Sequence, residues 1–236
     1  MTRQASKPAD PGDVVLGDHL VQARPSGVLW WPARSVLVVA DLHLGRAERM
    51  AREGGTLLPP YETTDTLDRL DAEVNRLNPR LVISLGDSFD DLAAAGNLDE
   101  AVVTRLGRLA AGRRLIWIAG NHDPGPLALP GSHLDQAQID GIMLRHIADE
   151  SKPGLEISGH YHPKARVTVK GRRIARRCFL VAGNRLILPA FGTYTGGLDV
   201  LDAAFDPVRG EASRALLTGN RIIALPVSHL REMARR

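Results

Sequence analysis

Three strand-length apolar runs, each ending at a polar motif, are the feature of this sequence that most restricts its fold. The runs cover residues 36–40, 81–85 and 114–119. The first is apolar throughout and rich in β-branched residues, which is typical of a strand buried on both faces of its sheet. Apolar residues at helical spacing predict helices over residues 62–77 and 98–111. This alternation indicates parallel strands joined by right-handed crossovers.

The second half of the chain has a different pattern, in which short predicted strands are separated by tight turns. They cover residues 142–146, 155–158, 166–169, 178–181, 186–188 and 221–225. We therefore expect an α/β fold in which two packed mixed sheets form a four-layer α/β/β/α sandwich. Residues 1–13 are polar and contain Pro and Gly, so we predict a flexible N-terminal tail, followed by a single domain over residues 14–236.

Five polar motifs follow predicted strands, and together they offer seven side chains that bind divalent cations well. The motifs are Asp41-Leu42-His43, Gly86-Asp87-Ser88-Phe89-Asp90, Gly120-Asn121-His122-Asp123, a lone His146, and Gly159-His160-Tyr161-His162. In an extended segment, residues two apart project to the same side. We therefore expect Asp41 and His43 to reach one cation, and likewise His160 and His162. Each motif alone is also common in surface turns and helix caps. Their occurrence in order, each beyond a strand end, favours a metal site.

Two neighbouring divalent cations that share a hydroxide are a common means of hydrolysing phosphate esters, through attack of that hydroxide on phosphorus. The predicted ligands are all nitrogen or oxygen donors, which accept Mn²⁺, Fe²⁺, Co²⁺ or Zn²⁺. Cys178 is the single cysteine, so a thiolate cluster and an intrachain disulfide are both excluded.

The series of motifs resembles the calcineurin-like metallophosphoesterase superfamily. The resemblance implies one metal on Asp41, His43, Asp87 and His162, and a second on Asp87, Asn121, His146 and His160, with Asp87 bridging both. His133 is the rival to His146, but it follows a Leu-Pro-Gly loop. The resemblance also implies that His122 binds no metal and assists the transition state or the leaving oxygen, and that Asp90 orients His122. DNA-repair nucleases of the superfamily often carry a histidine where this chain has Asp90.

The segments around the motifs resemble a narrower group, the bacterial ligase-associated DNA damage response endonuclease (PdeM) branch. The similar segments are residues 37–46, 159–163, 178–180 and 186–197. This resemblance implies a Mn²⁺-dependent endonuclease that cleaves single-stranded DNA in DNA repair. It further implies a functional link to an ATP-dependent DNA ligase and a helicase.

Basic residues gather after the last motif, although the formal net charge of the chain is only +3. A predicted hairpin carries Lys164, Arg166, Lys170, Arg172, Arg173, Arg176 and Arg177, which could guide a nucleic-acid backbone or form a solvated face. The candidate substrate-binding residues are Arg46, Arg49, Tyr61, Arg172 and Arg173. Aromatic platforms for bases are few, since Phe, Trp and Tyr make up 4% of the chain and Trp30 and Trp31 are also core candidates.

Other functions are compatible with the same motifs. The main alternative is a phosphodiesterase or pyrophosphatase for a small nucleotide, which would use the same metals in a closed pocket. A binding module stabilised by metal would not need the non-ligands His122 and Asp90. Protein phosphatase activity is disfavoured because Asp91 replaces the arginine usual in that group. No apolar run is long enough for a signal core or a membrane span, so we expect a cytoplasmic protein without a membrane partner.

Overall fold

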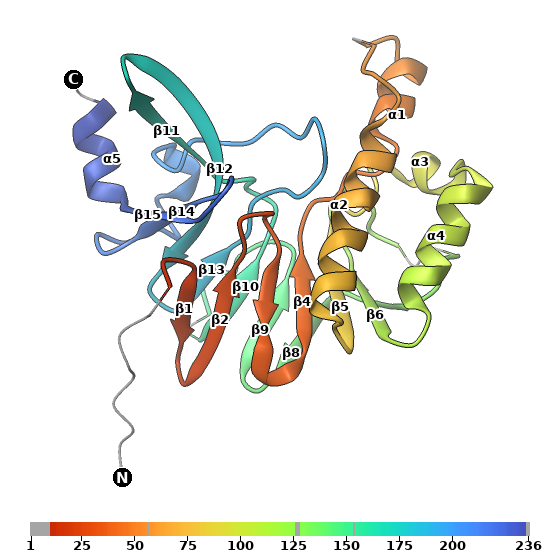
Figure 1. Ribbon diagram of the computed structural model, residues 1–236, viewed down its shortest axis with the longest axis horizontal. Helices are drawn as coiled ribbons and strands as arrows, with labels where there is room; N and C mark the ends of the chain where they lie inside the picture. Colours follow the sequence, from red (N-terminus) through yellow and green to blue (C-terminus); the bar gives the residue numbers. More distant parts are fainter. Residues whose placement is uncertain (1–9, 56, 126–127, 153, 235–236) are drawn as a thin grey trace.

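A seven-stranded mixed sheet forms one half of the protein, for which a computed structural model describes residues 10–55, 57–125, 128–152 and 154–234 (Figure 1). Its strands follow chain order from β1 to β7, and β4 to β7 run parallel. Their bounds are β1 Asp13–Leu16, β2 His19–Ala23, β3 Leu29–Trp31, β4 Val36–Val39, β5 Leu81–Leu85, β6 Arg114–Ile118 and β7 Ser132–Leu134. Of the predicted tail, residues 1–9 lie outside the described residues, and the division at residue 13 stays a prediction.

The second sheet follows the order β15-β14-β12-β13-β10-β9-β8, with β11 paired to β12. The bounds are β8 Gln136–Ile139, β9 Ile142–Arg145, β10 Leu155–Ser158, β11 Lys164–Val169, β12 Arg172–Ala182, β13 Arg185–Ile187, β14 Arg214–Leu217 and β15 Ile223–Pro226. Within it, β9, β10 and β13 run parallel, although the described residues between β9 and β10 form no helix. Each sheet therefore contains its own parallel group of strands.

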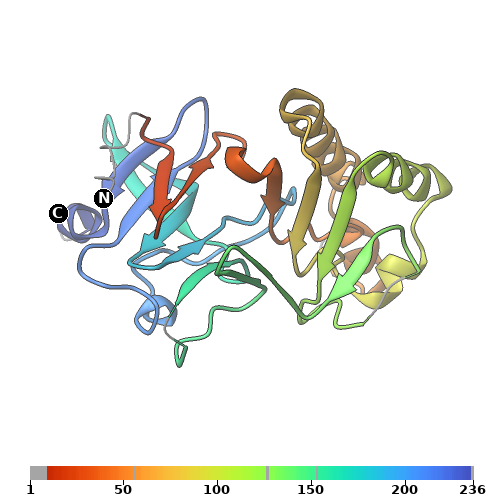
Figure 2. The same ribbon diagram turned by 90° about the horizontal axis from the view of Figure 1, so that it is seen from below.

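Helices cover the outer faces of both sheets. The helices are α1 Arg46–Arg52, α2 Glu62–Leu77, α3 Leu92–Gly96, α4 Glu100–Ala110 and α5 Val227–Ala234, and two 3₁₀ turns cover Pro32–Arg34 and Ala203–Phe205. Leu70 of α2 and Leu106 of α4 bury their side chains against the first sheet, whereas Leu230 of α5 packs on the second. Figure 2 shows the two halves from below, with α2 and α4 on one flank and α5 on the other. The expected four-layer α/β/β/α sandwich of two mixed sheets is confirmed.

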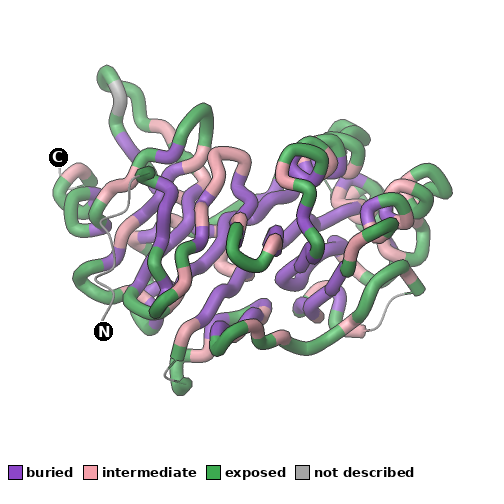
Figure 3. Tube along the Cα trace, turned by 60° about the horizontal axis from the view of Figure 1, so that its bottom comes forward, coloured by how far each residue is buried: buried purple, intermediate pink, exposed green. Residues whose placement is uncertain are grey.

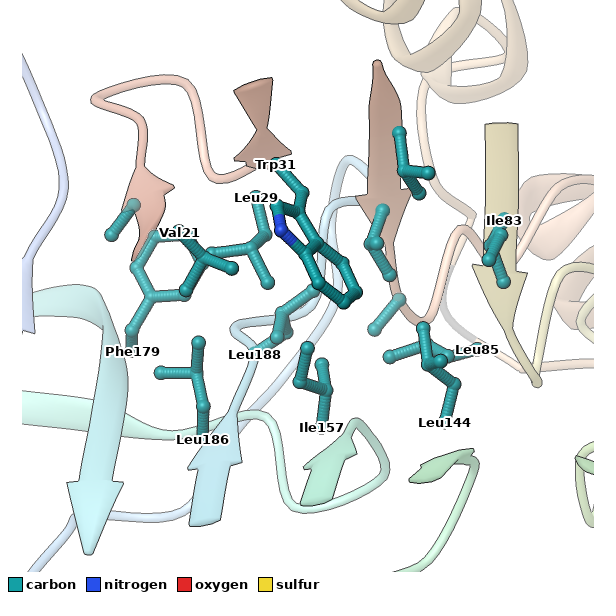
Figure 4. Close-up of a cluster of buried hydrophobic side chains, with 14 of the residues drawn as sticks. Val21, Leu29, Trp31, Ile83, Leu85, Leu144, Ile157, Phe179, Leu186 and Leu188 are labelled. Atoms are coloured by element: carbon teal, nitrogen blue, oxygen red, sulfur yellow. The ribbon is translucent and has the colours of Figure 1, made fainter. Parts of the chain in front are cut away.

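The largest core lies between the two sheets, as the close-up in Figure 4 shows. Trp31 and Leu85 of the first sheet meet Ile157, Phe179 and Leu186 of the second, and all five are fully buried. Side chains of this size each contribute about 1.5–3 kcal/mol on burial. The burial trace in Figure 3 shows buried segments along the strands and exposed ones along the outer helices. This core fixes how the ends of the two sheets face one another.

The two parallel groups end at the same edge of the sandwich. The chain turns there after β4, β5 and β6 of the first sheet and after β9 and β10 of the second. Backbone hydrogen bonds join the turns: Asp41 donates to the carbonyl of Gly86, and Gly159 donates to the carbonyl of His146. Among the described residues, the helices are all too short or too polar to cross a membrane.

Candidate binuclear metal centre

The seven expected ligands all lie at the edge where the parallel strands end. Four come from loops of the first sheet and three from loops of the second. They are Asp41, His43, Asp87 and Asn121 on one side, and His146, His160 and His162 on the other. The prediction that ligand motifs follow strand ends therefore describes their placement well, and it explains how residues up to 121 positions apart in the chain come together.

A first cluster joins Asp41, His43 and His162, whose donor atoms all lie within 4.8 Å of one another. The two imidazoles point Nε2 at each other across 3.4 Å, and Nε2 of His162 lies 3.3 Å from Oδ1 of Asp41. Asp41 and His43 are almost fully buried, whereas the His162 side chain is 17% exposed. The cluster is therefore closed on the protein side and reachable from solvent on the other.

A second cluster joins Asp87, His146 and His160. Nε2 of His146 lies 3.1 Å from Nδ1 of His160 and 3.3 Å from Oδ2 of Asp87. Oδ1 of Asn121 is 2.9 Å from the same His146 nitrogen. The rival His133 lies on β7, and His146 is the histidine that the structure brings to the other ligands.

The donor atoms of both clusters fit divalent cations. His146 donates its Nδ1–H to the carbonyl of Leu85 at 2.8 Å, and His43 donates its Nδ1–H to Asp90 at 2.8 Å. In the neutral imidazoles this leaves the Nε2 lone pairs aimed into the clusters. Nitrogen lone pairs about 3 Å apart, beside carboxylate and amide oxygens, are favourable only around a proton or a cation. The set of N and O donors suits Mn²⁺, Fe²⁺, Co²⁺ or Zn²⁺ alike.

Asp87 is the carboxylate proposed to bridge the two metals. The structure groups it with the second cluster, and its other oxygen, Oδ1, accepts a hydrogen bond from the backbone N–H of His122 at 2.9 Å. Burial raises the pKa of Asp87, but the hydrogen bond with His146 and the charges of His146 and His43 outweigh it and lower the pKa to about 2. Asp87 is therefore an anion over the whole working pH range.

The ligand backbones are not extended. Five of the seven ligands have positive φ angles, namely Asp41 (55°), His43 (47°), Asp87 (47°), His160 (72°) and His162 (47°). The expected extended backbone is therefore absent, although Asp41 and His43 share the first cluster as expected. Because of these left-handed turns, His160 joins the second cluster while His162 joins the first. Such conformations cost about 1–2 kcal/mol per residue and are concentrated at functional sites.

Asp90 and His122 are arranged differently from the expectation. The Asp90 carboxylate receives the Nδ1–H of the ligand His43, whereas His122 donates its own Nδ1–H to the backbone carbonyl of Asp90 at 2.9 Å. Asp90 thus orients His122 through its main chain and His43 through its side chain. No hydrogen bond involves Nε2 of His122 among the described residues, and His122 is partly exposed. That nitrogen remains available to a substrate.

Two arginines of α1 contact the same carboxylate. Arg46 lies 3.0 Å from Oδ1 of Asp90, and Arg49 lies 3.0 Å from Oδ2. Burial raises the pKa of Asp90, but the hydrogen bond from His43 and the charges of Arg46 and Arg49 lower it below its usual value. The two arginine side chains are still about one quarter exposed. Both residues therefore support the candidate metal site, and a guanidinium group is also well suited to bind a phosphate.

Asp123 is a functional residue for which the sequence analysis assigned no role. Its carboxylate accepts hydrogen bonds from the backbone N–H groups of Asp87, Ser88, Phe89 and Gly120 at 2.7–3.2 Å. These bonds fix the turn that carries Asp87. A Cβ atom at Gly120 would overlap Asp87, so the glycine is needed for this close approach. The only sequence signal for this role was that Asp123 is the fourth residue of the Gly-Asn-His-Asp motif.

The remaining candidate substrate-binding residues, Arg172, Arg173 and Tyr61, lie on different surfaces of the protein. In β12, Phe179 belongs to the core between the sheets and Leu180 to the core beneath α5. Because side chains alternate along a strand, Arg173 and Arg177 share the face of Phe179, and Arg172 lies on the opposite face. The exposed Tyr61 precedes α2, and its side chain forms no hydrogen bond with another described residue.

Several known proteins resemble this chain in sequence or in structure. The family model described as calcineurin-like phosphoesterase matches residues 34–184. A crystal structure of Pseudomonas putida nuclease MPE is similar with a TM-score of 0.71 and 27% identity, over 90% of this chain and 98% of that chain. The E. coli phosphoesterase Yfce reaches a TM-score of 0.40 at 14% identity, over 81% and 98% of the two chains. No curated protein sequence matches the chain.

Proposed function

Because the chain belongs to the calcineurin-like phosphoesterase family and is a metal-dependent phosphoesterase, we propose that it is a Mn²⁺-dependent endonuclease that cleaves single-stranded DNA. The similar P. putida protein is a nuclease, which supports a nucleic-acid substrate. The single observation that carries the proposal for this chain is a basic face on the β11–β12 hairpin, directly beside the metal ligands.

This basic inner face consists of Lys164, Arg166, Arg173 and Arg177. In the antiparallel hairpin Lys164 pairs with Arg177, Thr168 pairs with Arg173, and Arg166 lies between them, so all four side chains share one side. Arg166 is 71% exposed. β11 begins two residues after His162, so the row of cations starts at the site and leads away from it. A row of this kind fits successive phosphates of a strand better than one small nucleotide.

The residues at the metal centre divide into three proposed roles. The seven ligands, with Asp87 as the bridge, hold two divalent cations. When bound, these cations supply an activated water and neutralise charge on the phosphoryl oxygens. His122, held by the Asp90 carbonyl, presents Nε2 to the leaving oxygen and donates a proton from its charged form. Arg46 and Arg49 are proposed to bind a neighbouring phosphate, and the exposed Tyr61 before α2 remains a candidate substrate contact.

The setting of the reaction belongs to the same proposal. We place the protein in the cytoplasm, in DNA repair, with a functional link to an ATP-dependent DNA ligase and a helicase. The resemblance of residues 37–46 and 186–197 to the PdeM branch supports this setting.

A circular single-stranded DNA tests the proposed activity. With Mn²⁺ we expect the circle to be linearised and then shortened, and we expect Asp87→Ala to abolish this cleavage. A cyclic mononucleotide is assayed beside it under the same conditions. An intact circle together with fast hydrolysis of the mononucleotide would contradict the proposal and favour a small-nucleotide phosphodiesterase. A circular RNA in parallel tests the choice of DNA.

A further inference from the structure

A segment after β13 crosses the metal centre from one ligand to another. This strap, residues 191–198, is bound to the first cluster at both ends. The backbone N–H of Gly192 donates to the carbonyl of Asp41 at 3.0 Å. At the other end, Gly197 packs against the carbonyl of His162 with no space for a Cβ atom. The strap is therefore part of the rim of the proposed active site.

Three basic side chains hold the strap in place. Arg177 donates to the carbonyls of Phe191 and Gly192 at 3.2 and 2.7 Å. Arg69 of α2 donates to the Phe191 carbonyl at 2.8 Å and lies over the Phe191 ring, 4.5 Å from its centroid. Lys164 reaches the carbonyl of Thr195 at 3.5 Å. Burial, together with the charge of Arg69, lowers the pKa of Arg177 to about 10.

Tyr194 lies at the exposed middle of this fixed strap. Its φ angle is +60°, a conformation that a bulky aromatic residue rarely adopts, and 43% of its surface is exposed. It lies two residues from Gly192 and three from Gly197, so its Cα is within about 7 Å and about 11 Å of theirs. An exposed ring is thus held in a strained conformation between two anchors on metal ligands.

We propose that Tyr194 forms a nucleobase subsite, in which its ring stacks on a base next to the scissile phosphate. This inference rests on the proposed function and adds what the metal centre lacks, a contact that distinguishes a nucleic acid from other phosphodiesters. Arg166 and Arg173, the exposed cations of the basic inner face, hold the phosphates, and Tyr194 holds a base. Figure 1 shows the strap between the β11–β12 hairpin and α1, where a strand that follows the hairpin would pass.

Two substitutions separate the ring from the backbone conformation. Tyr194→Phe keeps an aromatic ring and removes the hydroxyl. Tyr194→Asn removes the ring, and asparagine tolerates a positive φ angle better than most residues. Both variants are compared by thermal unfolding, and we expect Tyr194→Asn to be no less stable than the wild type.

The test uses two oligonucleotides with Mn²⁺. One has normal bases, and the other has abasic sites at every position, so that the phosphodiester backbone is kept. For the wild type and Tyr194→Phe, we expect kcat/KM to be at least tenfold higher on the normal strand than on the abasic strand. In Tyr194→Asn we expect this ratio to fall about tenfold through loss of activity on the normal strand.

The possible results keep the two proposals apart. If the wild type cleaves neither strand while still hydrolysing a small diester, the proposed DNA substrate is wrong, and the subsite falls with it. If all three proteins cleave both strands at the same ratio, the endonuclease stands and the nucleobase subsite is overturned. A loss in Tyr194→Phe equal to that in Tyr194→Asn would assign the effect to the hydroxyl and also overturn stacking. As a second readout, a strand with 2-aminopurine should lose fluorescence on binding the wild type with Ca²⁺, but not on binding Tyr194→Asn.

Discussion

The Asp90 carboxylate accepts the Nδ1–H of His43 at 2.8 Å, which connects a proposed metal ligand to a carboxylate that is itself no ligand. Arg46 contacts the same carboxylate oxygen as His43, Arg49 contacts the other oxygen, and both keep the carboxylate ionised. A carboxylate in this position fixes the tautomer of the ligand histidine and makes its Nε2 a better electron-pair donor to the metal. Helix α1 therefore acts on the metal centre through Asp90.

Asp90→Asn should weaken metal binding. The amide carries no negative charge, so His43 becomes a poorer donor and the two arginines lose their partner. We expect a drop in metal affinity of about 10–100-fold and activity that recovers at high Mn²⁺. The measurement is a calorimetric Mn²⁺ titration of chelator-treated protein. Asp91→Asn is the matched control, because Asp91 caps α3 and pairs with Arg52. Equal affinities in both variants would rule out the proposed role of Asp90.

His122→Ala should lower turnover without removing the metals. Loss of a proton donor at the leaving oxygen reduces kcat by about 10²–10⁴. Metal content by elemental analysis should match the wild type, because His122 belongs to neither ligand cluster. His133→Ala serves as the control histidine and should retain activity. Near-wild-type turnover by His122→Ala would remove this residue from the mechanism.

Arg173→Ala should reduce the salt dependence of DNA cleavage. Arg173 lies on the basic inner face, and the equally exposed Arg176 lies on the other side of β12. One lost phosphate contact lowers the slope of log kcat/KM against log salt by about 0.7 for a single strand. We expect this change in Arg173→Ala, whereas Arg176→Ala should keep the wild-type slope. If both variants lose the same amount, binding depends on overall charge and not on one face of the hairpin.

Asp123 should make the stability of the metal-free protein depend on pH. Burial and the charge of Asp87 raise the pKa of Asp123 from 3.8 to about 6, although the backbone N–H groups of Ser88, Phe89 and Gly120 oppose the shift. Between pH 4 and pH 6 the folded state therefore binds more protons than the unfolded state, so stability falls as pH rises through this window. The raised pKa corresponds to a change in folding free energy of about 3 kcal/mol.

Urea unfolding of chelator-treated protein at several pH values measures this effect. Asp123→Asn should be less stable at every pH, because an amide cannot accept the same four hydrogen bonds. The advantage of the wild type over Asp123→Asn should be largest below pH 4 and should shrink above pH 6. A constant difference across this range would show that the pKa of Asp123 is not raised.

Much of the parallel framework could be predicted from the sequence, because buried parallel strands are continuous apolar runs. The predicted helix over residues 62–77 and the strand over residues 81–85 agree with α2 and β5 to the residue. Helix α3 was missed because five residues are too few for a periodic pattern. The hairpin β1–β2 was missed because its short strands carry exposed apolar side chains, Val15 and Leu20, which obscure the alternation.

The chemistry of the site was easier to predict than its geometry. Residue type and order identified the seven candidate ligands, since few other arrangements need so many imidazoles and carboxylates after strand ends. The left-handed turns at Asp41 and His160 have no sequence signal, because these residues are not glycines. The partner of Asp90 depends on where α1 packs, which is a tertiary contact. In the sequence, the strap could be recognised only through its resemblance to the PdeM branch. Its role at the site could not be predicted, because Arg69 and Arg177, which hold it, lie elsewhere in the chain.

The division of the ligands between two sheets has a consequence for how activity arises during folding. The first cluster contains Asp41 and His43 from one sheet and His162 from the other, and the second contains Asp87 from one and both His146 and His160 from the other. Neither half alone contains a complete candidate site. A growing chain that has made only its first sheet thus has no complete metal centre, and the phosphoesterase site forms only when the two sheets pack together. Cations bound there would connect the two sheets, so their removal should destabilise the contact between the sheets at this edge first.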